Sequence, residues 1–241
     1  MKINRLLYSA ASHPIILTKI GKKMRKYADG DYTEEERYEV AKEVTNEIFS
    51  KGHVKSIADG LENLPKEGGY VMFPNHQGKA DTLAIIQNHE EPCSVVIDNA
   101  VCTNPFLNGF IDLVKGKRLE KDNLRNVITL FKEVEDEIIN EQRRYIIFPE
   151  GMHDGNGNNL QEFHTGCMGF LYHAKCPIVP VCLYDTYKVY EVKGTGPVTC
   201  EAHFLKPIYY EEYKDLKKKE LADLVKSRIN EKLEELKKRE S

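Results

Sequence analysis

The stretch that decides the fold is Tyr70-Val71-Met72-Phe73-Pro74-Asn75-His76-Gln77-Gly78-Lys79-Ala80-Asp81, an apolar run that passes directly into a polar loop. The apolar part predicts a buried strand. On one continuous helix, a spacing of five residues would turn His76 and Asp81 roughly 140° apart, so their side chains would not meet easily. A strand that ends, a turn through Gln77 and Gly78, and a helix beginning near Asp81 would bring them together, and glycine permits such a turn.

In that arrangement Asp81 accepts a hydrogen bond from one imidazole nitrogen of His76 and fixes the tautomer, while the other nitrogen acts as a base. The residues from Asn75 to Asp81 include no serine, cysteine or threonine that would serve as a nucleophile. The base would therefore activate a hydroxyl group of the substrate, which predicts direct group transfer to an alcohol. The alternative is a loop histidine beside an ordinary helix-capping aspartate.

Two further apolar runs follow in a fixed order. Arg144-Tyr145-Ile146-Ile147-Phe148 runs into Pro149-Glu150-Gly151, and Pro177-Ile178-Val179-Pro180-Val181-Cys182-Leu183 comes later. An acid and a glycine at the carboxyl end of a strand are well placed for a site in an α/β protein. Together the segments resemble the N-H-x-x-x-x-D, F-P-E-G and V-P-V-type motifs of the glycerolipid acyltransferase superfamily, whose type members are 1-acylglycerol-3-phosphate acyltransferases. The resemblance spans roughly residues 53–210, most of the chain.

The resemblance implies a role for each motif residue. His76 would be the general base on the acceptor hydroxyl, a role worth roughly 10²–10⁴-fold in rate, and Asp81 would orient it. Glu150 and Gly151 would help to hold the acceptor, since a carboxylate can bond a glycerol hydroxyl and glycine lets the backbone approach. The alternative for Glu150 is a buried capping acid. Many family members have threonine and arginine after F-P-E-G, whereas this chain has Met152-His153, which leaves donor and acceptor preference open.

The family's basic motif, normally an arginine about six residues after a glycine, is matched only loosely. The candidate segments are Gly109-Phe110-Ile111-Asp112 and Gly116-Lys117-Arg118-Leu119-Glu120-Lys121. Arg118 is the favoured phosphate ligand because a guanidinium can grip two phosphate oxygens, and Lys121 and Lys117 follow it. The alternative is an exposed basic end of a strand.

Composition excludes several classes of protein. A length of 241 residues is at the upper end for a single α/β domain, and 41% hydrophobic with 30% charged residues is typical of a globular chain. A net charge of −3 argues against nucleic acid as the main partner. No stretch approaches 18 consecutive apolar residues, so no transmembrane helix is expected. No signal peptide is expected either, because the first apolar stretch, Leu6 to Ala11, is too short and Lys19 to Lys26 is strongly basic where a cleavage site would follow. P-loop and dinucleotide-binding glycine patterns are also missing from the sequence.

The cysteines and histidines do not form metal-binding patterns. No C-x-x-C pair occurs, and free buried thiols in a reducing cytoplasm are expected instead of disulfides. The histidines outside the motifs, His164, His173 and His203, lie too far from matching acids or cysteines to suggest zinc. We expect no metal and no cofactor, because a thioester donor itself carries the activation energy. The six cysteines are Cys93, Cys102, Cys167, Cys176, Cys182 and Cys200.

The N-terminal 52 residues are expected to form a helical region, and residues 53–241 an acyltransferase domain with a C-terminal helix, as one structural unit. A capping box at Thr33 and Glu36 predicts a helix start. Upstream, basic and apolar residues alternate around Pro14, which suits contact with a membrane interface. The alternative is a plain amphipathic helix packed on the domain. The basic residues are Lys2, Arg5, Lys19, Lys22, Lys23, Arg25 and Lys26, and the apolar ones are Ile3, Leu6, Leu7, Ile15, Ile16, Leu17 and Ile20.

Alternation of strand-like and helix-like segments predicts an α/β fold, a mixed sheet flanked by helices on both faces, with amphipathic helices at the N-terminus. Helices are expected over residues 81–88, 122–140, 166–174 and 215–241, and strands over 54–57, 94–98 and 198–205. Asp122 is the expected cap of the second helix. Its expected inward stripe is Leu124, Val127, Phe131, Val134 and Ile138.

These observations predict an O-acyltransferase of phospholipid biosynthesis, peripheral at the cytoplasmic face of the membrane. It would move a fatty acyl group from acyl-CoA or acyl carrier protein to the free hydroxyl of 1-acylglycerol-3-phosphate, giving phosphatidic acid. Its partners would be a lysophospholipid, an acyl thioester, a membrane surface and acyl carrier protein if that is the donor, but not nucleic acid. The alternatives are transfer to glycerol-3-phosphate or another lysophospholipid, and a non-catalytic peripheral lipid-binding protein of the same fold.

Overall fold

The apolar runs of the sequence form the central strands of one seven-stranded sheet, whose strand order is β1-β7-β6-β2-β5-β3-β4. This is seen in a computed structural model, which describes residues 13–152, 155–192, 194 and 196–239. Neighbouring strands are parallel except for β6 and β7, so the sheet is mixed, as predicted. The strands are β1 Val54–Asp59, β2 Val71–Pro74, β3 Cys93–Asp98, β4 Lys117–Leu119, β5 Arg144–Ile147, β6 Ile178–Tyr184 and β7 Val198–Phe204.

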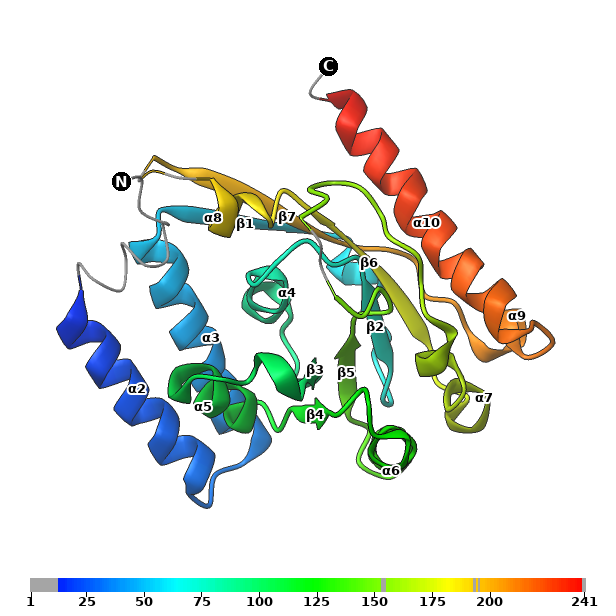
Figure 1. Ribbon diagram of the computed structural model, residues 1–241, viewed down its shortest axis with the longest axis horizontal. Coiled ribbons are helices and arrows are strands. Elements are labelled where there is room, and N and C mark those ends of the chain that lie inside the picture. Colours follow the sequence, from blue (N-terminus) through cyan, green and yellow to red (C-terminus); the bar gives the residue numbers. More distant parts are fainter. Residues whose placement is uncertain (1–12, 153–154, 193, 195, 240–241) are drawn as a thin grey trace.

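Both faces of the sheet are covered, which explains why β2 and β6 are apolar along their whole length. Side chains alternate between the faces of a strand. Val71 and Phe73 therefore join one buried cluster, with residues of α6, α7 and α10, and Met72 joins the other, with residues of α2, α3 and α4. Figure 1 shows α2 and α3 on one side of the sheet and α10 on the other.

The helices complete the two layers. The longer ones are α2 Pro14–Asp29, α3 Glu34–Lys51, α4 Asp81–Asn88, α5 Pro105–Leu113, α6 Leu124–Asn140 and α10 Lys218–Arg239. The short ones are α7 Leu171–Ala174, α8 Lys188–Glu191 and α9 Tyr210–Tyr213, with 3₁₀ turns η1 Leu61–Asn63, η2 Asn99–Val101 and η3 Thr165–Met168. Within the described ranges, none of these helices is both long enough and apolar enough to cross a bilayer.

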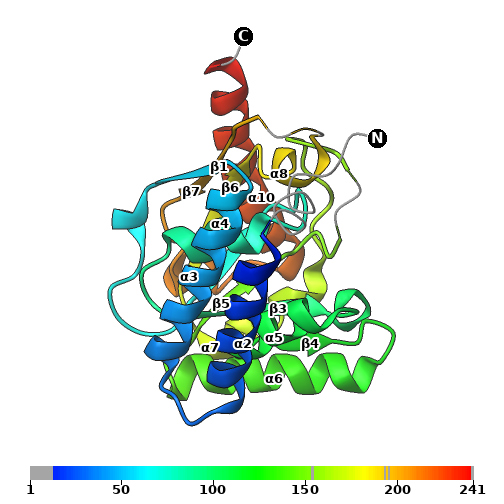
Figure 2. The same ribbon diagram turned by 90° about the vertical axis from the view of Figure 1, so that its left-hand side faces the viewer.

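The N-terminal helices α2 and α3 pack side by side on the face of the sheet to which Met72 points (Figure 2). The predicted capping box at Thr33 and Glu36 is present at the start of α3. In α2, which begins at Pro14, Ile20 and Met24 are buried. Its basic residues Lys19, Lys22, Arg25 and Lys26 are exposed. The basic and apolar residues of the segment 1–12 lie outside the described residues.

Four details of the sequence prediction are wrong. Helix α6 is capped by Asn123, whose side chain accepts the Asn126 N–H, and not by Asp122. Leu124 is 71% exposed because it lies in the first turn, before the buried positions of α6 begin at Leu130. The helix expected over residues 166–174 is divided into η3 and α7, and the C-terminal helix begins at Lys218, three residues later than expected.

Candidate active site

The fold brings the loops that carry the sequence motifs to one edge of the sheet. Strands β2, β3, β5 and β6 run parallel to one another through their shared neighbours, so their carboxyl ends meet at the same edge. The segment 75–80 follows β2, the segment 148–151 follows β5, and Asp185 with Thr186 follows β6. Ligands of open α/β sheets bind outside the carboxyl ends of the strands.

His76 and Asp81 meet as the sequence predicts. Strand β2 ends at Pro74, α4 begins at Asp81, and His76 Nδ1 lies 2.7 Å from Asp81 Oδ2. The same oxygen accepts the backbone N–H groups of Gln77 at 2.6 Å and Gly78 at 2.8 Å. A carboxylate at His76 Nδ1 favours the tautomer with its proton on that nitrogen. The opposite nitrogen, Nε2, is then the basic one.

The turn does not use the conformational freedom of glycine, contrary to the sequence prediction. Gly78 is not among the residues with positive φ, and a Cβ there would have Tyr187 Cα as its nearest neighbour, at 3.8 Å. The turn is instead closed by Asp81, which accepts two successive N–H groups and donates its own N–H to the Gly78 carbonyl at 3.3 Å. Side-chain bonds to nearby backbone groups are a common way to fix such a turn.

The imidazole of His76 is held at the surface of the site. Its ring lies against that of Phe148, with centroids 4.3 Å apart, and its side chain is 20% exposed, whereas that of Asp81 is 1% exposed. Its backbone N–H donates to Glu150 Oε1 at 3.2 Å. The loop after β5 therefore contacts His76 through both its aromatic and its acidic residue.

Glu150 is buried without full compensation. It is 2% exposed, and burial raises the pKa of its carboxyl group to about 7. Among the described residues, Oε2 has no well-formed hydrogen bond and no ion-pair partner, although the nearby backbone N–H of Gln161 acts on the carboxyl group and offsets part of the rise in its pKa. A buried acceptor without a donor is rare, and such a group beside a reactive side chain is a candidate for contact with a substrate. Gly151, next in the chain, has φ 74°, a conformation that favours glycine.

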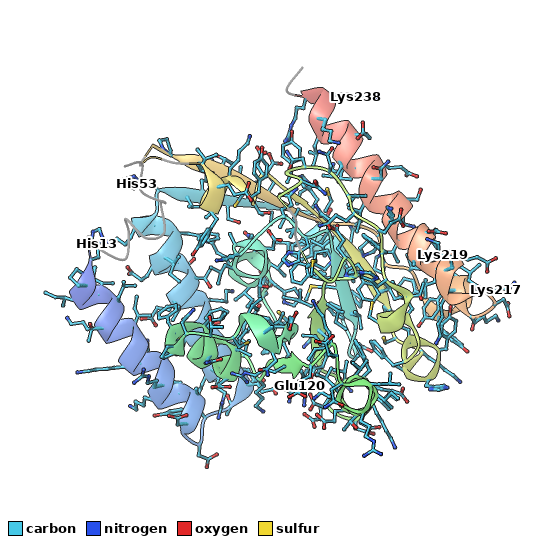
Figure 3. All side chains as sticks on the ribbon, in the orientation of Figure 1. His13, His53, Glu120, Lys217, Lys219 and Lys238 are labelled. Carbon is cyan, nitrogen blue, oxygen red and sulfur yellow. The ribbon has the colours of Figure 1, made fainter. Side chains whose placement is uncertain are left out.

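The three basic candidates point in different directions. Lys121 lies beyond the end of β4, where its ammonium group donates to the Gly151 carbonyl at 2.7 Å and pairs with Asp98 at 2.8 Å. Arg118 donates to Asp112 at 2.7 Å and to the Asn108 carbonyl on α5. Lys117 pairs with Glu137 and Glu133 on α6. Only Lys121 of the three contacts the 148–151 loop through a bond that the described residues show. Figure 3 labels Glu120, the residue that precedes Lys121 in the chain.

Sequence reasoning missed the residues that join the loops to one another. The hydroxyl of Thr186 lies 2.6 Å from Asp81 Oδ1, and the side chain of Asn75 exchanges two hydrogen bonds with the backbone of Leu183. Gln77 and Asn158 bond each other between these loops. No local pattern could have found Thr186, since it lies 105 residues after Asp81 and merely follows an apolar strand.

The cysteines are free thiols, as predicted, and five of them are buried; Cys102 is half-buried. Burial raises the pKa of Cys93, Cys167, Cys176 and Cys200 to about 12, and also raises that of Cys182 and Cys102. A thiol is a weak nucleophile until it ionises. Within residues 13–152, 155–192, 194 and 196–239, no three histidine, cysteine or acidic side chains are grouped to hold a metal ion. His153 lies outside these ranges.

Known proteins are similar to this chain in sequence and in fold. The acyltransferase family model matches residues 55–184. A 1-acyl-sn-glycerol-3-phosphate acyltransferase of Borreliella burgdorferi is 24% identical over 187 residues, covering 76% of this chain and 74% of that protein. The 1-acyl-sn-glycerol-3-phosphate acyltransferase alpha of Mus musculus is 24% identical over 152 residues, covering 62% of this chain but 53% of the mouse protein. The chain thus matches about half the length of the mouse relative.

The fold also matches a solved structure. The crystal structure of the 1-acyl-sn-glycerophosphate (LPA) acyltransferase PlsC from Thermotoga maritima covers 97% of this chain and 95% of its own, with a TM-score of 0.76 and 18% sequence identity. At that identity the match establishes the fold alone. Because the family model spans more than half of the sequence and contains the loops that bear His76, Asp81 and Glu150, this chain belongs to the acyltransferase family.

Proposed function

We propose that this protein transfers a fatty acyl group from an acyl thioester to the free hydroxyl of 1-acylglycerol-3-phosphate, giving phosphatidic acid. The single observation that carries the proposal is the bond between His76 and Asp81 beside the buried carboxylate of Glu150. The names of the similar proteins support the choice of acceptor. The donor is acyl-CoA or acyl carrier protein, and no cofactor takes part.

In the proposed reaction, Nε2 of His76 removes the proton of the acceptor hydroxyl as its oxygen attacks the thioester carbonyl. The carbon–oxygen bond forms, the carbon–sulfur bond breaks, and the imidazolium returns its proton to the leaving thiol. The carboxylate of Asp81, 2.7 Å from Nδ1, stabilises the imidazolium formed during attack. Its burial strengthens this interaction, because the effective dielectric constant of the interior is low.

The acceptor is held by two groups on opposite sides of its glycerol unit in this proposal. Glu150 Oε2, buried and without a well-formed hydrogen bond in the described structure, accepts a hydrogen bond from the glycerol part. Lys121, which already touches the Gly151 carbonyl, turns its ammonium group to the phosphate. Asp98 pairs with Lys121, so the phosphate competes with this carboxylate for the ammonium group. Each of the three cations is paired with a carboxylate, and Lys121 is favoured over Arg118 and Lys117 because it also contacts the Gly151 carbonyl.

Direct transfer is favoured over a covalent acyl-enzyme. The cysteines are held as neutral thiols by burial, which makes them poor nucleophiles near neutral pH. The side chain that touches Asp81 besides His76 is a threonine whose hydroxyl is fully buried. The substrate hydroxyl is then the nucleophile.

We also propose that the enzyme works at the cytoplasmic surface of an anionic membrane. On α2, Lys19, Lys22, Arg25 and Lys26 are exposed, and Ile15 is 72% exposed. Cations beside an exposed apolar side chain suit contact with anionic headgroups. Sedimentation with vesicles of anionic lipid and of neutral lipid tests this, and equal binding to both would contradict it.

Release of coenzyme A from acyl-CoA, with and without 1-acylglycerol-3-phosphate, tests the reaction. Wild-type protein should release thiol only when the acceptor is present, and His76→Ala should lose roughly 10²–10⁴-fold of that rate. His173→Ala is the matched control, since the His173 side chain is 78% exposed and lies on α7, where it pairs with Glu135 of α6.

The donor and acceptor panel then sharpens the outcome. Acyl carrier protein replaces coenzyme A in one series, and glycerol-3-phosphate and other lysophospholipids replace the acceptor in another. Activity with a different acceptor but not with 1-acylglycerol-3-phosphate would overturn the proposed substrate. Lipid binding without thiol release from any pair would overturn the enzymatic assignment.

A further inference from the structure

We infer that Thr186 is a positioning residue for the His76–Asp81 pair, acting through the second oxygen of the aspartate. Asp81 is fully buried, and its Oδ2 already accepts from His76, Gln77 and Gly78. Its Oδ1 has one donor among the described residues, the Thr186 hydroxyl at 2.6 Å. Thr186 is itself fully buried.

The neighbouring amide of Gln77 fixes where the hydroxyl proton goes. Gln77 Nε2 donates to the Leu183 carbonyl at 3.0 Å and to Asn158 Oδ1 at 2.7 Å, so its Oε1 faces Thr186. That oxygen already accepts the Thr186 backbone N–H at 3.0 Å. It also lies 2.8 Å from the Thr186 hydroxyl, which has only one proton to donate.

The proton goes to Asp81. Asp81 Oδ1 is charged and lies closer to the Thr186 hydroxyl than Gln77 Oε1 does. Because Asp81 is fully buried, bulk water cannot donate to that oxygen in place of the hydroxyl. Hydrogen bonds to charged acceptors are stronger than those to neutral ones. The loop after β6 therefore holds the Asp81 carboxylate against rotation and keeps Oδ2 on His76 Nδ1.

This role rests on the proposed function only for its kinetic consequence. If the imidazolium forms during acyl transfer, an Asp81 that has lost its second donor would orient and stabilise that cation less well. Since Thr186 does not touch the substrate in this account, its loss should lower kcat and leave the KM values of both substrates little changed.

Three variants test the kinetic effect. Thr186→Val keeps the shape and removes the hydroxyl, and we expect kcat to fall by about 10–100-fold, the size associated with a lost hydrogen bond to a charged group. Thr186→Ser restores the hydroxyl and should recover most of kcat. Thr45→Val is the matched control, because Thr45 is also fully buried but donates to Ala41 within α3.

A double-mutant cycle separates positioning from general structural damage. In the Asp81→Asn background, Thr186→Val should have little further effect on kcat, because the two residues act through one contact. Overturning results are a Thr186→Val kcat equal to that of the wild type, no recovery in Thr186→Ser, or the same loss in both backgrounds. If Thr186→Val does not fold, Thr186→Ala removes the hydroxyl without adding bulk and replaces it.

A measurement on the free protein keeps this inference separate from the proposed function. The Nδ1 proton of His76 should give a downfield proton NMR resonance, assigned by its loss in His76→Ala. It should shift in Thr186→Val and stay in place in Thr186→Ser and Thr45→Val. An unchanged resonance in Thr186→Val would overturn the positioning role, even if the protein transferred acyl groups. A shifted resonance would support it, even if 1-acylglycerol-3-phosphate proved the wrong acceptor.

Discussion

Two clusters of charged side chains lie at opposite edges of the same sheet, and they differ in how completely their charges are paired. At the amino edge, Arg143 precedes β5 and contacts the carboxylates of Glu34, Glu137 and Glu141. At the carboxyl edge, Asp81 is surrounded by donors, but Glu150 keeps one buried oxygen without a well-formed hydrogen bond in the described structure.

The difference separates a structural cluster from a reactive one. The arginine at the amino edge joins the N-terminus of α3 to the C-terminal part of α6 and to β5, and each carboxylate around it has a cationic partner. At the carboxyl edge, Glu150 Oε2 has neither a well-formed hydrogen bond nor an ion pair among the described residues, and it lies beside a histidine at the surface. At the amino edge, Glu34 Oε1 and Arg143 Nε also lack hydrogen bonds, but each lies within ion-pair distance of an opposite charge. Buried polar groups are normally satisfied, so an exception at a sheet edge that binds ligands marks the site.

The largest expected effect comes from a substitution at the carboxyl edge, which should lower the rate and leave the fold intact. Asp81→Asn should lower kcat by up to about 10⁴-fold, the upper limit expected for loss of the base itself, because an amide at this position favours the wrong tautomer of His76. The fold should persist, since α4 and β2 keep their apolar contacts. Thiol release and circular dichroism together check this. A variant that retains most of its activity would mean that His76 does not depend on Asp81.

A change at the amino edge should lower the stability of the fold and leave the reaction rate unchanged. Arg143→Met removes one partner from each of three carboxylates, of which Glu34 keeps Lys115 and Glu137 keeps Lys117. We therefore expect the free energy of unfolding to fall by about 3 kcal/mol, the low end for a broken buried ion pair. The acyl-transfer rate per folded molecule should be unchanged. Urea denaturation and a rate normalised to folded protein measure the two quantities. A lower normalised rate would show that the two edges are coupled.

The third effect depends on pH and concerns Glu150. Its pKa is raised to about 7 in the folded protein, from 4.5, so its favourable contribution is complete below pH 4.5 and is lost as the pH rises through 7. Glutamine does not ionise, so Glu150→Gln does not lose stability as the pH rises. This variant should be more stable than wild type by roughly 2–3 kcal/mol at pH 8, but not at pH 4.5.

Urea denaturation of both proteins at the two pH values checks this prediction. Glu150→Gln should also lose activity, because an amide oxygen accepts a hydrogen bond from the substrate's hydroxyl group less strongly than a carboxylate does. An equal stability difference at both pH values would show that burial does not perturb this carboxyl group.

The smallest expected effect compares two lysines of one segment. Lys121→Met should raise the KM for the phosphorylated acceptor by about 10-fold, as for one lost charged hydrogen bond. Lys117→Met should not, because that ammonium group is held by Glu137 and Glu133 on α6. Steady-state kinetics with varied acceptor measure both. The reverse ranking would move the phosphate away from the Gly151 loop.

Much of the carboxyl edge could be predicted because its residues are close in sequence. A strand, a short turn and a helix start are local patterns, and they brought His76 to Asp81 with the expected contact. The interpretation of Gly78 was wrong, because side-chain bonds from Asp81 close the turn in place of an unusual glycine conformation. The choice of Asp122 as a cap failed for a similar reason, since the adjacent Asn123 reaches the free N–H group.

The amino acid sequence by itself determined the mixed α/β class, the order of the motifs and the His76–Asp81 pair, because each depends on neighbours within a few residues. Tertiary structure alone decided which cation contacts the Gly151 loop. Alternation in β4 sends Lys117 and Arg118 to opposite faces of the sheet, while Lys121 lies past its end. It also decided that Thr186 reaches Asp81, since strand order, and not sequence distance, sets which loops meet.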